Sequence, residues 1–184
     1  MKINIVLSLL LLFVGSASFT ASSQSDTTIL PLDKDGEKIL YQGVVEAEGS
    51  ANELFYRAVT WMNDYWVNAR GVIKKQDRPN GILIAQPRFD IKKETEEGNM
   101  QRAGRMIYVL KLEFKDGRYR YTVSDLNLKG TSPFPLENWI DPGSEYYDQR
   151  DQAVLHIIDD EIRSMIDHMH EGMTKEEEKS NDDW

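Results

Sequence analysis

The sequence predicts an α+β domain in which one antiparallel sheet carries two helices packed on a single face. Residues 50–66 and 149–170 are each apolar along one side at helical spacing. Residues 105–128 alternate apolar and polar side chains on both sides of an Asp-Gly turn. Helices and a sheet that are apolar on one side can bury those sides against each other. The expected order of elements is β-α-β-β-β-β-α.

The first helix is expected in the stretch GSANELFYRAVTWMNDYW, residues 49–66. Ser50 and Glu53 have the spacing of a capping box, which satisfies free backbone N–H groups at a helix start. At about 100° per residue, eight apolar or aromatic residues share one arc: Leu54, Phe55, Ala58, Val59, Trp61, Met62, Tyr65 and Trp66. Such a stripe is typical of a buried helix face, so we interpret these rings as core and not as a ligand surface.

Three strands are expected outside the Asp-Gly hairpin, at residues 39–47, 72–77 and 82–91. The last of these contains Pro87, which cannot donate a hydrogen bond to a neighbouring strand and therefore marks an edge or a bulge. Residues 92–101 are charged and contain a glycine, and we expect them to form a loop.

The hairpin is predicted most sharply, because Asp116 and Gly117 separate two alternating runs and fix their register. The apolar face is expected to pair Phe114 with Tyr119, Leu112 with Tyr121, and Leu110 with Val123. The polar face is expected to pair Lys115 with Arg118, Glu113 with Arg120, and Lys111 with Thr122. One face of this sheet is therefore apolar and the other faces water.

The N-terminal segment predicts export. Residues 1–23 begin with one lysine, continue with a short apolar run and end in small residues, as in a secretory signal peptide. We expect a periplasmic or extracellular protein with no stable membrane anchor after cleavage. Residues 24–37 are expected to be a flexible lead-in, residues 38–172 a single domain, and residues 173–184 a disordered acidic tail.

Composition argues against several functions. The formal net charge of -9 disfavours nucleic acid and anionic lipid headgroups as partners. The chain has no cysteine, and it lacks the Gly-x-Ser-x-Gly and phosphate-loop motifs. We therefore expect no enzyme activity, no cofactor and no metal.

At this point the chain resembles a known family. The element order, the stretch VVEAEGSANELFYRAVTWMNDYW and the hairpin YVLKLEFKDGRYRYTVSDL are similar to an exported bacterial domain of unknown function. That family is assigned the fold of a half-repeat of the TATA-box-binding protein (TBP), and the resemblance extends over residues 39–170. It implies a TBP-like fold and an exported location, but no catalytic residues. DNA binding is not implied, because the expected polar sheet face mixes charges of both signs.

The expected function is a non-catalytic binding module for a protein or small ligand in the bacterial envelope. The long connection at residues 129–148 offers Trp139, Tyr146 and Tyr147 as contact residues, since long loops within compact domains often bind a partner. The polar sheet face offers Lys111 and Arg120. The same aromatic residues could instead seal one edge of the sheet.

Two alternatives remain at this point. One is a metal-dependent or hydrolase-like envelope enzyme that uses the polar side of the second helix, where His156 and Asp160 are spaced i,i+4. The other is a structural accessory domain.

Overall fold

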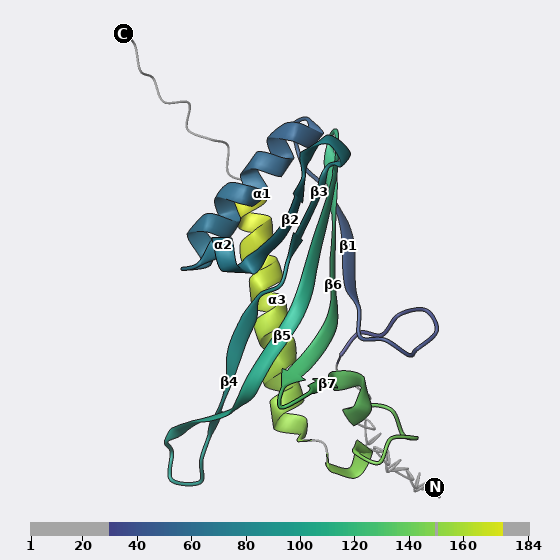
Figure 1. Cartoon of the computed structure of the whole chain (residues 1–184), viewed down its shortest axis with the longest axis vertical. Coiled ribbons are helices and arrows are strands. Elements are labelled where there is room, and N and C mark those ends of the chain that lie inside the picture. Colours follow the sequence, from purple (N-terminus) through teal and green to yellow (C-terminus); the bar gives the residue numbers. More distant parts are fainter. Residues whose placement is uncertain (1–29, 150, 175–184) are drawn as a thin grey trace, which may run out of the picture.

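The computed structural model describes residues 30–149 and 151–174 (Figure 1). The strands are β1 (Tyr41–Glu46), β2 (Ile73–Asp77), β3 (Ile82–Ala85), β4 (Arg88–Glu94), β5 (Met100–Lys115), β6 (Arg118–Lys129) and β7 (Pro133–Pro135). The helices are α1 (Ala51–Tyr65), α2 (Ala69–Val72) and α3 (Gln152–Thr174), with short 3-10 turns η1 (Arg78–Asn80), η2 (Leu136–Trp139) and η3 (Tyr147–Gln149).

Within the described ranges the seven strands form one sheet of order β1-β6-β5-β3-β2, and every pairing is antiparallel. The long strand β5 is its spine. Along one side of β5, β3 pairs with the second half and β4 with the first half. On the side of β6 that faces away from β5, β1 pairs with the first half of β6 and β7 pairs with its end.

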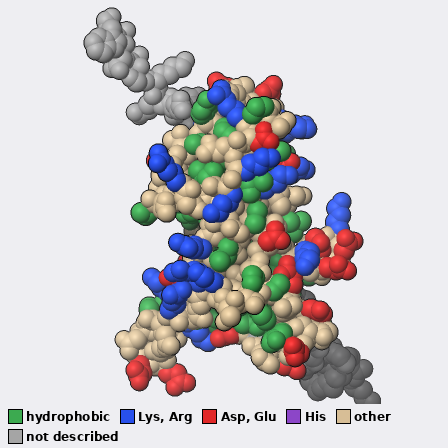
Figure 2. Space-filling view, viewed as in Figure 1, with side chains coloured by type: hydrophobic (Ala, Val, Ile, Leu, Met, Phe, Trp, Pro, Cys, Tyr) green, Lys and Arg blue, Asp and Glu red, His purple; other side chains and the backbone are tan. Residues whose placement is uncertain are grey.

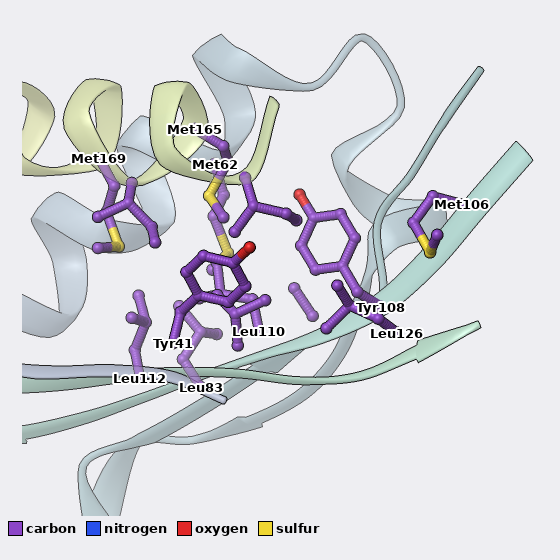
Figure 3. Packing of buried hydrophobic residues seen from close by; sticks show 14 of the residues in the cluster. Tyr41, Met62, Leu83, Met106, Tyr108, Leu110, Leu112, Leu126, Met165 and Met169 are labelled. Carbon is purple, nitrogen blue, oxygen red and sulfur yellow. The ribbon is translucent and has the colours of Figure 1, made fainter. Parts of the chain in front are cut away.

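Both long helices lie on one face of the sheet (Figure 1). Ser50 begins α1, and the capping box with Glu53 is present as the sequence predicts. The predicted stripe of α1 is buried at Leu54, Phe55, Ala58, Trp61 and Met62. Figure 3 shows methionines of the two helices facing leucines of the sheet across the core: Met62, Met165, Met169, Leu83, Leu110 and Leu112. The expected α+β fold is therefore confirmed.

The hairpin register is also confirmed, with Phe114 opposite Tyr119 and Glu113 opposite Arg120. Gly117 has a φ of 76°, a value that glycine adopts without steric cost. The register between the two strands shifts between Ile107 and Val109 of β5, opposite the part of β6 that contains Asp125, whose φ is 53°. Because of this bulge, the next buried side chain of β6 after Val123 is Leu126, three residues further on instead of two.

The strand expected at residues 82–91 is two strands. Gln86 and Pro87 interrupt it, and the Gln86 N–H donates to the carbonyl oxygen of Val72 at 2.8 Å, away from β5. The loop expected at residues 92–101 was also predicted too long, because β4 continues to Glu94 and β5 starts at Met100. Charged side chains are compatible with strands here because both strands extend into a protruding hairpin (Figure 1).

The ends of the domain differ from the expectation. Residues 30–37 are not a loose lead-in: Leu30 is 2% exposed, and the Asp33 side chain accepts the backbone N–H groups of Glu37 and Lys38. Helix α3 continues to Thr174, and Met173 is fully buried, so the domain does not end at 172. The expected signal peptide and residues 24–29 lie outside the described residues, as does the tail from 175. No helix in the described ranges is long and apolar enough to cross a membrane.

Candidate functional site

The face of the sheet opposite the helices is open. Its side chains alternate with the buried ones, and we call the following set the open face: Gln42, Val44, Glu46, Lys75, Asp77, Ile82, Ile84, Arg88, Asp90, Arg105, Ile107, Val109, Lys111, Glu113, Lys115, Arg118, Arg120 and Thr122. Seven members are Lys or Arg and four are Asp or Glu. On a protein whose formal charge is -9, this face carries an excess of positive charge.

Figure 2 shows Lys and Arg side chains along this side of the molecule, with hydrophobic side chains between them. Near the β5–β6 turn the surface forms a hollow of about 390 Å³. Val44 and Ile82 supply apolar walls, while Lys115, Arg118 and Arg120 supply positive charge. The hollow thus combines an apolar surface with basic groups around it.

Glu113 lies at the centre of the basic groups. Its carboxylate contacts Lys111 Nζ at 3.0 Å and Arg120 at 2.7 Å. Partial burial opposes ionisation, but the hydrogen bonds from Lys111 and Arg120 outweigh it, so the pKa of Glu113 is lowered. One carboxylate therefore orients two cations and leaves one excess positive charge.

Asp90 repeats this arrangement on β4. Its carboxylate contacts Arg105 at 2.6 Å and Arg102 at 3.1 Å, and the hydrogen bond from Arg105 lowers the pKa of Asp90. Among the described residues, Arg88, Lys115 and Arg118 form no ion pair. These side chains can bind an acidic group without first breaking an internal ion pair.

The turn that carries Lys115 and Arg118 is held in place by the start of α1. The Asp116 carboxylate accepts the Ala51 N–H at 2.8 Å, and the Gly117 N–H donates to the Gly49 carbonyl at 2.9 Å. The hydrogen bond from Ala51 satisfies one of the free N–H groups of the first turn. The basic end of the open face is therefore built on a fixed hairpin.

The neighbouring wall depends on Gly81, which ends η1 with a φ of 61°. A Cβ at this position would lie 2.8 Å from the Phe114 carbonyl oxygen. The Phe114 N–H donates to the Gly81 carbonyl at 2.8 Å, so the two chains pass at close range. A glycine here allows Ile82 to lie beside β5.

The structure brings together two of the predicted site residues, Lys111 and Arg120, because both contact Glu113 on the open face. Lys115, Arg118 and Val44 were not selected from the sequence as site residues. The alternation of the hairpin places the two basic residues on this face, but the sequence does not reveal the hollow that joins them to Val44.

The other predicted residues, Trp139, Tyr146 and Tyr147, lie in the connection that follows β6. Phe134 of β7 contacts Trp139 and Tyr146, with ring centroids 6.0 and 5.0 Å apart. Trp139 packs against the core, whereas Tyr146 is 37% exposed. This aromatic cluster is roughly 25 Å along β6 from Arg120, since β7 pairs with residues 127–129. The predicted residues therefore form two separate groups.

The helix positions considered for a metal or hydrolase site are exposed. His156 and Asp160 lie on the solvent side of α3. Within residues 30–149 and 151–174, no group of three or more His, Asp or Glu side chains is arranged to hold a metal ion. The arrangement thus offers no support for the metal-dependent alternative.

The fold and the site define a two-layer α+β domain with one helix-covered sheet face and one open face. Residues 41–129 match the model of the family described as a domain of unknown function (DUF4468) with TBP-like fold, which confirms the expected resemblance to a domain of unknown function with this fold. No curated protein matches the chain.

Two solved structures are similar in fold. A TBP-like protein from Parabacteroides distasonis has a TM-score of 0.61 at 12% identity, over 78% of this chain and 96% of that chain. A DUF4468 family protein from Bacteroides ovatus has a TM-score of 0.63 at 12% identity, over 82% of this chain and 93% of that chain. These likenesses confirm the expected TBP-like fold.

Proposed function

We propose that this chain is an exported, non-catalytic binding module whose open face binds an acidic segment of a partner protein. The observation that carries the proposal is the excess of positive charge around an apolar hollow on a protein that is acidic overall. The exported location in this proposal depends on the N-terminal segment, residues 1–23.

Charge complementarity supports the choice of an acidic partner. Lys115 and Arg118 form no ion pair with any described residue, and Arg120 is oriented by Glu113. Positive charge presented in this way accelerates the encounter with an acidic segment and selects its register.

Apolar contact supplies the affinity in this proposal. Val44 is 61% exposed, and it lines the hollow together with Ile82. Complete burial of an exposed valine side chain contributes about 1.5–3 kcal/mol. A partner with acidic residues alternating with apolar ones would use both properties of the hollow.

The carboxylates of the open face favour a protein over a polyphosphate. Glu46, Asp77, Asp90 and Glu113 are distributed among the cations. A nucleic acid presents phosphates at regular, close spacing and would meet these carboxylates along its length. A protein segment can place a neutral or basic residue opposite each of them.

The test measures the affinity of a fluorescein-labelled peptide of alternating Glu and Phe residues by fluorescence anisotropy. A matched peptide has Gln in place of Glu. The Glu peptide is expected to bind more tightly, and the double variant Lys115→Glu, Arg118→Glu should weaken it about tenfold or more. Two Lys→Glu changes away from the face, at Lys34 and Lys38, provide a control with the same change in net charge.

Equal affinity of the double variant and the parent protein would overturn the proposal. It would also be overturned if a DNA duplex or phosphatidylglycerol vesicles bound more tightly than the Glu peptide through Lys115 and Arg118. In that case the face would recognise phosphate and not an acidic protein segment.

A further inference from the structure

A second, separate groove lies at the edge of the sheet, between β1 and the last turns of α3. Its volume is about 410 Å³, and mostly polar groups line it. The lining residues whose side chains matter here are Tyr41, Tyr121, Arg163, Asp167 and His170. The binding module proposed above does not use this groove.

Gly43 makes room for the aromatic wall of the groove. A Cβ at Gly43 would lie 2.7–2.8 Å from ring atoms and the hydroxyl of Tyr121, its partner on β6. The Tyr121 ring therefore lies across β1 and reaches the edge of the sheet. There it contacts the ring of His170, with centroids 5.3 Å apart.

Tyr119 holds one ring nitrogen of His170, which lines the groove. Tyr119 is 1% exposed, and its hydroxyl lies 2.6 Å from His170 Nδ1. Because a buried hydroxyl needs an acceptor for its proton, the Tyr119 hydroxyl donates to Nδ1. Burial lowers the pKa of His170, which favours the neutral ring. In this tautomer the proton is on Nε2, the nitrogen that Tyr119 does not use.

Arg163 and Asp167 complete the polar lining. The Asp159 carboxylate accepts the Tyr41 hydroxyl at 2.7 Å and Arg163 Nε at 2.9 Å, so one edge of the guanidinium is held. Among the described residues Arg163 and Asp167 form no ion pair with each other, although they are spaced i,i+4. The groove thus offers donors from Arg163 and His170 and an acceptor from Asp167.

We infer that this groove is a saccharide-binding site. Hydroxyl groups of a sugar ring each donate and accept, and the groove provides donors on Arg163 and His170, which Asp159 and Tyr119 hold in place, and an acceptor on Asp167. The Tyr121 ring adds an aromatic surface for the apolar face of a sugar. An anion would meet the Asp167 carboxylate, and an apolar ligand would leave the polar groups of the groove unsatisfied.

The test is a titration of the ¹⁵N-labelled protein with methyl glycosides of glucose, galactose, mannose and N-acetylglucosamine, followed by amide NMR spectra. At least one glycoside is expected to shift resonances of Gln42, Tyr121 and His170 with a single saturable Kd. Asp167→Asn should raise this Kd about tenfold, because it removes a charged acceptor. Asp160→Asn, the same change on the exposed side of α3, should leave it within about twofold.

Tyr121→Phe keeps the ring and removes the hydroxyl, so it should also weaken binding while the protein stays folded. The inference is overturned if no glycoside in the panel shifts the groove resonances. It is equally overturned if Asp167→Asn and Asp160→Asn bind alike, or if sodium sulfate shifts the groove resonances at lower concentration than every glycoside. The variants Lys115→Glu and Arg118→Glu on the open face should not change glycoside binding.

Discussion

At the scale of residues, two carboxylates of the open face each hold two basic side chains in place. Glu113 and Asp90 each contact two basic side chains. Each such group contains one carboxylate and leaves one excess positive charge. Lys111 and Arg120 were predictable members of this face, because strict alternation from the Asp-Gly turn places them there. The contact between Tyr121 and Gly43 could not be predicted from the sequence, because the two residues are 78 positions apart and meet only through the pairing of β1 with β6.

His170 predicts a pH dependence of stability. Its pKa in the folded protein is lowered from 6.5 by burial, while Asp167 opposes the shift and Tyr119 and Tyr121 contact the ring. Above pH 6.5 His170 is neutral in both states and this effect is absent. As the pH falls below 6.5, the unfolded state binds the proton more readily, so the folded protein loses stability.

Urea unfolding between about pH 8 and about pH 5 measures this effect. His170→Gln should reduce the loss of unfolding free energy at acidic pH. His156→Gln, on the exposed side of the same helix, should leave the profile of the parent protein unchanged. Identical pH profiles for His170→Gln and the parent protein would contradict the assignment.

At the scale of elements, β5 and α1 are linked through the β5–β6 turn. The turn and the helix start were both predictable, the first from Asp116 and Gly117 and the second from Ser50 and Glu53. The contact between the turn and the helix start could not be predicted, because a local sequence pattern does not show which turn lies beside which helix. Residues 82–91 were predicted as one strand because their apolar phase continues across Pro87. The pairing with β5 also keeps one register, from Ala85 opposite Leu110 to Arg88 opposite Ile107, but Pro87 has no N–H to donate to a neighbouring strand.

The contact between turn and helix predicts the effect of a substitution. Asp116→Ala removes the acceptor for the Ala51 N–H and should lower the free energy of unfolding by about 1 kcal/mol. Asp116→Asn keeps both an acceptor and a good turn residue, so its cost should be smaller. Urea titrations compare the two variants. Equal losses for both would show that the hydrogen bond to α1 does not stabilise the fold.

At the scale of the whole molecule, the two faces of the sheet have separate roles. One is covered by α1 and α3 and forms the core, and the other remains open (Figures 1 and 2). This division was predictable, because two helices and one hairpin each showed a single apolar side. The positive excess of the open face was not predictable from the net charge, which is dominated by acidic residues elsewhere in the chain.

The most direct measurement is an NMR map of the protein bound to the peptide of alternating Glu and Phe residues. We expect the largest shifts on the walls of the hollow, at Val44, Ile82, Glu113 and Arg118. Shifts concentrated on α3 or in the connection at residues 129–148, with these four residues unchanged, would contradict it. The binding surface would then be the helix layer or the aromatic cluster, and not the open face of the sheet.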